Sequence, residues 1–281
     1  MSARVVFVTG SSTGIGEATA LQFARLGDTV YATMRTPDRS GDTLRAASQL
    51  EGLDLTLVAL DVNDEHSVAR AVGAALERSG HIDVLVNNAG IGSLTSVEAA
   101  LMEDAKAVFE TNVFGLVEII RRALPALRET RGVVCNITSC SILAPVPFFA
   151  AYRASKAAVS ALGESLRTEL AGTGGRVLEV QPGAIRTDML AGSEGPPETG
   201  TLEAYQRVAE HFQRLRDATR DQFEEVDVAA RAIVDGILDD TAMHRLAPDA
   251  MSAGMLAAWR ASDDETILRG FLAALGEGAR D

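Results

Sequence analysis

Cysteine, tryptophan and histidine are scarce in this chain. It has two cysteines, one tryptophan and four histidines. Cys135 and Cys140 lie close together in an apolar run where a strand and a turn are expected, which favours two free thiols over a disulfide. The histidines, at positions 66, 81, 211 and 244, are scattered and lack metal-ligand spacing. No metal site is therefore expected.

Positive charge and long apolar runs are also in short supply. The chain has 26 Lys and Arg against 39 Asp and Glu, a net charge of −13. This balance argues against nucleic acid or an anionic membrane as a partner. No stretch reaches the ~18 apolar residues of a spanning helix, and the first apolar run is too short for a signal peptide. We expect a cytoplasmic protein without a membrane span.

Short apolar runs alternate with stretches of helical periodicity along most of the 281 residues. Strands that are apolar on both faces, each followed by a helix, predict an α/β fold with a doubly wound parallel sheet. In such a fold ligands bind at the carboxyl ends of the strands. We expect one domain over residues 1–281. The expected strands are 5–8, 29–33, 55–60, 84–86, 133–138 and 177–181, and the expected helices include 15–26, 64–78, 102–128 and 154–171.

The segment 190–225 differs in composition from the rest. Residues 192–200 are rich in Gly, Pro, Ser and Glu, and apolar residues at helical spacing follow, from Leu202 to Leu215. The segment reads equally well as a surface loop with an amphipathic helix and as a lid over a pocket. The region 249–281 is rich in Ala and Met and is expected to be a helical extension.

A glycine-rich turn joins the first strand to the first helix. Its sequence, residues 9–16, has Gly10, Gly14 and Gly16 in the spacing Gly-x-x-x-Gly-x-Gly. Glycine lets a backbone approach a ligand closely, and a helix start offers free amides and a positive dipole end, which suit a pyrophosphate. The alternative is a tight turn without a ligand.

Tyr152 and Lys156 are four residues apart, so a helix places them on one face. A nearby ammonium favours the phenolate and is expected to lower the tyrosine pKa toward neutral pH. Such a pair can exchange a proton with a substrate oxygen. Tyr and Lys occur at this spacing by chance in many helices. The motifs upstream are what make a catalytic role for this pair credible.

Taken in order, the motifs resemble the short-chain dehydrogenase/reductase family over roughly residues 4–190. The resemblance rests on the glycine turn, Asn87-Asn88-Ala89-Gly90 and Tyr152 with Lys156. Further matches are Asp61-Val62, Asn112, Ser139 and Pro182-Gly183. Residues 30–35 and 244–250 are most similar to the branch with 17β-hydroxysteroid dehydrogenase type one and retinol dehydrogenases. The family has a Rossmann fold and reduces or oxidises C–O groups with NAD(P).

The resemblance implies a role for each matching residue. Tyr152 would be the acid in reduction and the base in oxidation, Lys156 would also bind the nicotinamide ribose, and Ser139 would donate to the substrate oxygen. Asn112 would shape a water relay through a local break in its helix. The implied cofactor contacts are Gly10, Gly14, Ile15 and Gly16 at the diphosphate, Asp61, Val62, Asn87, Ala89 and Gly90 along the adenosine, and Pro182, Gly183, Ile185 and Thr187 at the carboxamide. For Ser139, Asn112 and 87–90 the alternatives are a turn cap, a helix cap and a strand-ending turn.

Cofactor choice depends on the end of the second strand. Met34 stands where an acidic residue would accept the ribose hydroxyls of NAD, and Arg35 follows it. A guanidinium binds a phosphate with two hydrogen bonds, and Ser11 and Ser12 offer hydroxyls nearby. We therefore predict NADP(H) over NAD(H). The alternative is that Arg35 pairs with Asp38.

Apolar residues around the expected pocket, among them Phe148, Phe149 and Met189, suit a steroid-, retinoid- or polyketide-like ketone or alcohol, and are equally compatible with core or subunit contacts. The rival within the fold is a 3-oxoacyl carrier-protein reductase, and the rival from another class is a catalytically silent cofactor sensor. The intact set of Ser139, Tyr152 and Lys156 argues against the sensor. The resemblance also implies a homodimer or homotetramer formed through helices near 102–130 and 152–172, where small residues such as Ala154 and Ala157 allow close approach.

Overall fold

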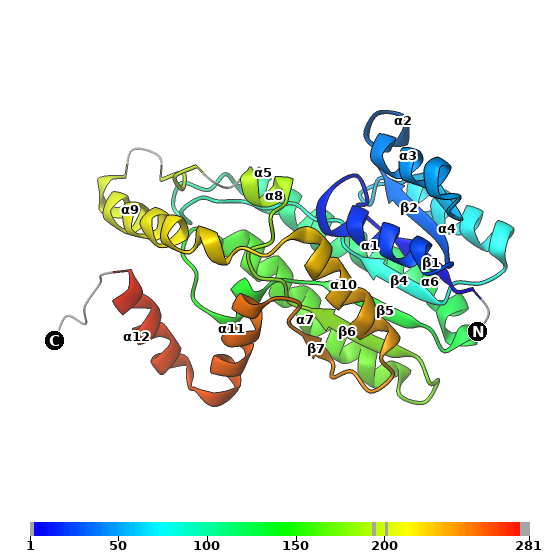
Figure 1. Cartoon of the computed structure of the whole chain (residues 1–281). Helices are drawn as coiled ribbons and strands as arrows, with labels where there is room; N and C mark the ends of the chain where they lie inside the picture. Colours follow the sequence, from blue (N-terminus) through cyan, green and yellow to red (C-terminus); the bar gives the residue numbers. More distant parts are fainter. Residues whose placement is uncertain (1–2, 193–194, 200–201, 276–281) are drawn as a thin grey trace.

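A seven-stranded parallel sheet runs through the molecule, as the computed structural model of residues 3–192, 195–199 and 202–275 shows (Figure 1). The strand order is β3-β2-β1-β4-β5-β6-β7, and every neighbouring pair is parallel. The chain order reverses between β1 and β4, which is where ligands bind in open α/β sheets. The predicted doubly wound fold is thus confirmed. The strands are β1 (Val5–Val8), β2 (Thr29–Met34), β3 (Leu55–Ala59), β4 (Val84–Asn87), β5 (Val133–Ile137), β6 (Arg176–Val180) and β7 (Arg245–Leu246).

Both faces of the sheet are covered, and the strand sequences reflect this. Successive side chains point to opposite faces, so Phe7 joins one core while Val6 and Val8 join the other. All three are fully buried. A strand buried on both faces needs apolar residues at every position, which explains the near-continuous runs.

Two layers of helices sandwich the sheet. One core contains residues of α4 (Glu65–Ser79), α6 (Leu116–Thr130) and α7 (Ala150–Leu170). The other contains residues of α1 (Gly14–Arg25), α3 (Asp42–Glu51) and α10 (Val226–Leu238). The remaining helices are α2 (Pro37–Ser40), α5 (Met102–Phe109), α8 (Asp188–Ala191), α9 (Glu203–Ala218), α11 (Ala250–Ala261) and α12 (Asp264–Ala274), with short helices η1 (Glu110–Gly115), η2 (Cys140–Leu143) and η3 (Arg220–Gln222).

Several elements depart from the sequence prediction. β7 was not predicted, because two residues carry no periodicity of their own. The helix expected to begin at 154 begins at Ala150, so Tyr152 lies inside its first turn. The helix predicted over 102–128 is present and contains a π-helical turn, η1, around Asn112. This turn is the local break that the resemblance implied.

The lid segment and the C-terminal extension meet at one end of the molecule. α9 and α12 lie together there, on the left of Figure 1. Phe148, Ala209, Phe212 and Leu275 form one buried cluster, which joins the two helices to the loop before α7. The predicted helices over 202–215 and after Pro248 are confirmed, and residues 193–194, 200–201 and 276–281 lie outside the described part.

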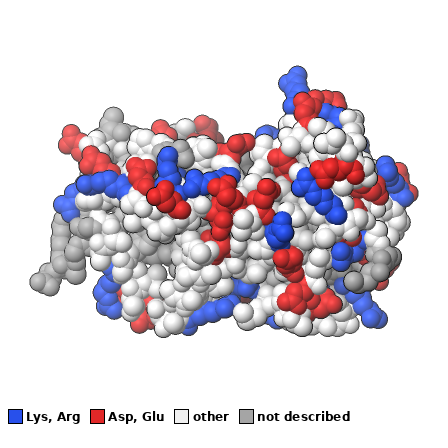
Figure 2. Space-filling view, in the orientation of Figure 1, with Lys and Arg blue, Asp and Glu red and all other residues white. Residues whose placement is uncertain are grey.

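Both cysteines are free and buried, as predicted. None of the described helices has the length and apolar character to cross a membrane. Figure 2 shows basic and acidic side chains interspersed over the visible face, without a large region of one sign.

Candidate functional site

The glycine turn after β1 is packed tightly against the segment after β4. A Cβ on Gly10 would lie 2.8 Å from Ala89 Cα, and one on Gly16 would lie 2.4 Å from both the Gly10 carbonyl oxygen and Asn88 Nδ2. Gly10 and Gly14 have φ of 68° and 64°, in the left-handed region that favours glycine. The local geometry therefore demands glycine at all three positions.

The first turn of α1 is open to an anion. Its N-cap residue, Thr13, makes no side-chain capping hydrogen bond, so the first amides of the helix are left for another acceptor. Ile15 packs on the core with its side chain and contributes only backbone to this end. The turn and the helix start therefore fit the diphosphate that the sequence predicts here.

Asn88, which the sequence analysis did not single out, holds the two segments together. Its Nδ2 donates to the carbonyl oxygens of Thr9 and Gly10, at 3.0 and 2.9 Å. Thr9 Oγ1 accepts from the backbone amides of Asn88 and Ala89, both at 3.0 Å. The glycine turn is therefore fixed from the neighbouring strand.

Asn87 points the other way. Its side chain is buried and donates from Nδ2 to Asn136 Oδ1 on β5, at 2.9 Å. The side chain of Asn87 is therefore engaged within the sheet, and only its backbone is left for the predicted contact along the adenosine.

Tyr152 and Lys156 lie on one face of α7, as predicted. Lys156 Nζ is 5.8 Å from the centroid of the Tyr152 ring and donates to the carbonyl oxygen of Ile137 at 2.8 Å. Lys156 is buried and Tyr152 half-buried. The ammonium is therefore held by the end of β5 as well as by its own helix.

The pKa of Tyr152 is raised to about 12 by burial, against which a hydrogen bond with Ser139 acts. Burial also lowers the pKa of Lys156 to about 8. The prediction of a lowered tyrosine pKa is wrong for the protein alone. Desolvation determines the direction of the tyrosine pKa shift, and the ammonium donates its hydrogen bond to Ile137 and not to the phenol.

Ser139 follows β5 and caps η2. Its Oγ accepts from the Ser141 amide at 3.2 Å, so the turn-capping alternative and the hydrogen bond with Tyr152 coexist. The Ser141 hydroxyl is buried and has no hydrogen-bond partner among the described residues. A buried hydroxyl without a hydrogen-bond partner destabilises the protein, so a ligand oxygen that bonded to Ser141 Oγ would be stabilised here.

Asn112 lies in η1 and connects three segments. Its Oδ1 accepts from the Ile91 amide at 2.8 Å, and its Nδ2 donates to the Ile91 carbonyl and to Ser155 Oγ, at 3.0 and 2.9 Å. A Cβ on Gly90 would lie 3.1 Å from Asn112 Oδ1 and 3.4 Å from Lys156 Nζ. The segment after β4, the π-helical turn and α7 therefore converge on one point.

Arg35 is exposed and makes no ion pair or hydrogen bond within the described residues; in particular, it does not pair with Asp38. Ser11 is different from what the sequence suggests. It is fully buried, and its hydroxyl donates to the Val8 carbonyl at 3.1 Å. The prediction that this hydroxyl helps to bind a phosphate is wrong, whereas Ser12 is half-buried and remains a candidate.

The loop after β6 faces the glycine turn. A Cβ on Gly14 would lie 3.1 Å from Thr187 Cγ2, and Thr187 caps α8 by accepting from the Leu190 amide. Ile185 is buried, so that only its backbone is offered to a ligand. The Pro182–Gly183 turn follows β6 directly, next to the end of β5.

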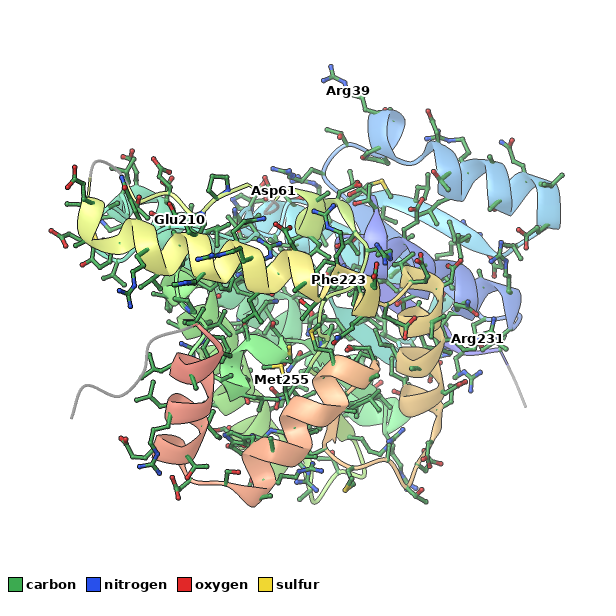
Figure 3. The ribbon with its side chains drawn as sticks, turned by 60° about the vertical axis from the view of Figure 1, so that its left-hand side comes forward. Arg39, Asp61, Glu210, Phe223, Arg231 and Met255 are labelled. Carbon is green, nitrogen blue, oxygen red and sulfur yellow. The ribbon has the colours of Figure 1, made fainter. Side chains whose placement is uncertain are left out.

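Asp61 and Val62 follow β3 at the same edge of the sheet. Both are half-buried, and Asp61 Oδ1 accepts from the Asn63 amide at 3.0 Å. Val62 packs on η1, where its carbonyl oxygen would lie 2.8 Å from a Cβ on Gly115. Asp61 is labelled in the upper part of Figure 3.

An apolar wall stands beside Tyr152. The rings of Phe149 and Tyr152 are in edge contact with centroids 6.1 Å apart, and Phe149 contacts Phe212 of α9 at 6.0 Å. Phe148, also against Phe212, has φ of 67°, which a bulky residue adopts only when its surroundings force it. The carbonyl oxygen of Phe148 accepts from the Thr95 amide at 2.8 Å. The wall is therefore built from three segments that lie far apart in the sequence.

The site thus combines a glycine turn at a helix start, loops at the carboxyl ends of the strands, and a phenol, a hydroxyl and an amine beside an apolar wall. This set is suited to hold a dinucleotide and to move a proton at a substrate oxygen.

Comparison with known proteins agrees with this chemistry. A sequence profile of the family described as "short chain dehydrogenase" matches residues 4–196. Among curated proteins, a 3-ketodihydrosphingosine reductase of Bacteroides thetaiotaomicron is 32% identical over 73% of this chain and 72% of its own length. An 11-beta-hydroxysteroid dehydrogenase A of Sesamum indicum is 33% identical, covering 83% of this chain and 65% of its own. Retinol dehydrogenase 8 of Bos taurus is 35% identical over 66% of this chain and 60% of its own.

Solved structures extend the similarity over nearly the whole chain. A short-chain dehydrogenase from Streptomyces avermitilis has a TM-score of 0.79 and 32% identity, covering 98% of this chain and 97% of its own. One from Burkholderia cenocepacia in complex with NADP has a TM-score of 0.74, 27% identity and 98% coverage of both chains. One from Burkholderia phymatum in complex with NAD has a TM-score of 0.76 and 25% identity, covering 100% of this chain and 97% of its own.

Proposed function

Since the chain belongs to the short-chain dehydrogenase family, we propose that it transfers a hydride between NADP(H) and a carbonyl or secondary alcohol of a hydrophobic small molecule. Members of this family are oxidoreductases that act on alcohol or ketone groups. The observation that carries the proposal is the convergence of Lys156, Asn112 and Gly90 beside Tyr152.

Different residues of the site transfer the proton and stabilise the developing charge. The nicotinamide, when bound, supplies or accepts the hydride. Tyr152 gives its proton to the carbonyl oxygen in reduction and takes it back in oxidation, while Ser139 donates a hydrogen bond to the same oxygen. The buried ammonium of Lys156 favours negative charge nearby and has protons left to donate to ribose hydroxyls, because Ile137 takes only one of its three. Asn112 keeps the π-helical turn in place, which frees backbone groups for a water relay.

The choice of NADP(H) is supported by Arg35. Its exposed side chain follows directly on β2, where the Thr33 carbonyl oxygen accepts from the Ser11 amide of the glycine turn at 2.8 Å. Met34 provides no carboxylate for ribose hydroxyls. A free guanidinium fits a 2′-phosphate with two charge-assisted hydrogen bonds. The structural relatives include one complex with NADP and one with NAD, so the support comes from this chain's own residues.

A hydrophobic substrate is supported by the wall beside Tyr152. Phe149, Phe212 and Leu275 come from the loop before α7, from the lid segment 190–225 and from the extension 249–281. The relatives are named for a ketodihydrosphingosine, a hydroxysteroid and a retinol, which are all large and mostly apolar. We infer that lid and extension together close over a substrate of this kind.

The loss of NADPH absorbance with a panel of carbonyl compounds tests the function. The panel contains a steroid ketone, retinal, a 3-ketosphingoid base, a 3-oxoacyl thioester and a small polar ketone. We expect turnover of at least one of the first three and little of the last. Binding of NADPH without turnover of any compound would favour a cofactor sensor, and a strong preference for the thioester would favour the acyl-carrier reductase.

We also propose that the protein is a homodimer or homotetramer. Ala154 and Ala157 of α7 are exposed, so a second copy can approach that helix closely. Light scattering that gives the mass of one chain would contradict this proposal.

A further inference from the structure

The Pro182–Gly183 turn after β6 is held from both sides. The Cys140 amide donates to the Pro182 carbonyl oxygen at 2.9 Å, and the Gly183 amide donates to Asp249 Oδ2 at 2.7 Å. A Cβ on Gly183 would lie only 2.5 Å from Asp249 Oδ1. The contact with Asp249 is therefore close, and it is made by a residue 66 positions further along the chain.

Asp249 has more hydrogen bonds than a helix cap needs. Its Oδ1 accepts from the Ser252 amide at 2.9 Å, which caps α11, and its Oδ2 accepts from Ser252 Oγ at 2.7 Å in addition to Gly183. The residue is 8% exposed. Asp263 caps α12 in the same way, through the Thr266 amide at 2.7 Å, but is exposed and has no contact with a loop of the site. One oxygen of Asp249 thus caps α11, and the other accepts from both Ser252 Oγ and the Gly183 amide of the turn.

The helix that Asp249 begins packs beneath the catalytic serine. Leu256 of α11 contacts Cys140 and Leu143 of η2, the short helix that Ser139 caps. Met255 lies against the same cluster and faces inward in Figure 3. α11 is therefore connected to the turn through Asp249 and to η2 through Leu256.

We propose that Asp249 is a positioning residue for the nicotinamide end of the cofactor site. Its carboxylate fixes the orientation of the Gly183 amide and locks the turn to α11. The inference rests on the proposed function and on the prediction from the sequence that this turn contacts the carboxamide of the nicotinamide. Hydride transfer falls steeply when the reacting atoms are misplaced by about 1 Å, so a turn anchored on two sides serves the reaction directly.

Replacement of Asp249 by Asn tests the proposal. The amide retains the shape but has one acceptor oxygen in place of two, so it cannot serve both the Gly183 and Ser252 amides. We expect the Kd for NADPH to rise about tenfold and kcat to fall, while the Kd for 2′,5′-ADP, which lacks the nicotinamide half, stays within about twofold. Asp263→Asn is the matched control and should change neither Kd.

Ser252→Ala provides a second, milder variant. It keeps the carboxylate and its contact with Gly183 but removes one donor to Oδ2. We expect a smaller rise in Kd, again for NADPH and not for 2′,5′-ADP, and this variant decides the matter if Asp249→Asn does not fold. Equal weakening of both ligands, or no change in either for a folded variant, would overturn the proposal.

The wild-type protein separates this inference from the proposed function. If it binds NADH in place of NADPH, the same comparison is made with NADH and ADP-ribose. If it binds neither nucleotide, the proposed function itself is wrong. If it binds and turns over normally and Asp249→Asn does the same, only the positioning by Asp249 is wrong.

Discussion

The ammonium group of Lys156 donates a hydrogen bond to the carbonyl oxygen of Ile137, 2.8 Å away at the end of β5. Ser139 comes two residues after Ile137, so one hydrogen bond joins the helix that carries Tyr152 and Lys156 to the strand that precedes the serine. The position of the amine is set by the sheet and not by the phenol. Its burial, in turn, determines how the site responds to pH.

The reductive reaction should weaken above about pH 8. The pKa of Lys156 is lowered to about 8, so the ammonium loses its proton as the pH rises through that value. The pKa of Tyr152 is raised to about 12, so the phenol remains a donor over the same range. We expect kcat/KM for ketone reduction to be flat below about pH 8 and to fall above it, and the falling limb to move upward in Lys156→Arg. A limb that stays in place in the variant would contradict the assignment.

The free energy of unfolding should rise above about pH 8, where the activity falls. Between pH 8 and the ordinary lysine value of 10.5, the unfolded chain binds more protons at Lys156 than the folded protein, so the free energy of unfolding rises with pH. Tyr152 reverses this trend between 10 and about 12, because there the folded state keeps the proton. Denaturant titrations from pH 7.5 to 9.5, in steps of ~0.5 unit, would show that lost activity is not lost structure.

Tyr152→Phe should remove ~10²- to 10⁴-fold of the turnover and leave the Kd for NADPH nearly unchanged, because only the proton donor is lost. Single-turnover absorbance and fluorescence titration measure the two quantities. Tyr205→Phe is the matched control: its hydroxyl donates to Glu98 Oε2 at 2.8 Å on the surface of the lid. Wild-type turnover in Tyr152→Phe would remove the phenol from the mechanism.

Arg35→Ala should raise the KM for NADPH by ~10- to 100-fold and leave the KM for NADH within a small factor, since only the former has a phosphate at that end. Arg39→Ala is the control, because Arg39 projects from α2 away from the body of the molecule (Figure 3). Equal use of both nucleotides by the wild-type protein would refute the NADP(H) preference.

Gly16→Ala should weaken NADPH binding by about tenfold or more. The added Cβ would lie 2.4 Å from the Gly10 carbonyl oxygen, a backbone atom that moves only with the whole turn. Gly73→Ala, in the middle of α4 with nothing within 4 Å of the new Cβ, should stabilise the protein by up to ~1 kcal/mol and bind NADPH normally. Isothermal titration and thermal unfolding of both variants provide the comparison.

Phe212→Leu should raise the KM for a hydrophobic ketone several-fold with kcat little changed, because the ring contacts Phe148 and Phe149 in the wall. Phe23→Leu, at a buried position of α1, is the control. It should lower the free energy of unfolding by ~1 kcal/mol and leave KM unchanged. If both variants change KM alike, the wall beside Tyr152 does not contact the substrate.

Local sequence patterns were sufficient for the parts of the fold that depend on local chemistry. Residues adjacent in the chain are enough to predict the buried strands β1 and β4, the turn with Gly10 and Gly14, and most of the helix that carries Lys156. β7 was missed because its two residues are strand only through their pairing with β6.

The errors at the site have two physical origins, which are the direction of side chains and their burial. The sequence places Ser11 in the glycine turn but does not show that its hydroxyl points into the protein and donates to the Val8 carbonyl oxygen. Likewise, the spacing of Tyr152 and Lys156 shows their common face but not the desolvation that raises one pKa and lowers the other. Asp249 follows a proline and precedes a helix, which marks a cap, but its second partner, Gly183, is visible only in three dimensions.

The buried cluster of Phe148, Phe212 and Leu275 has a consequence for biosynthesis. The ribosome adds roughly 120 residues between Tyr152 and Leu275, which at ~5–20 residues per second takes about 6–24 s. During this interval the nascent chain already contains Tyr152 but lacks the last part of the apolar wall beside it. The emerging protein therefore exposes these aromatic rings to chaperones until α12 has been translated and has docked.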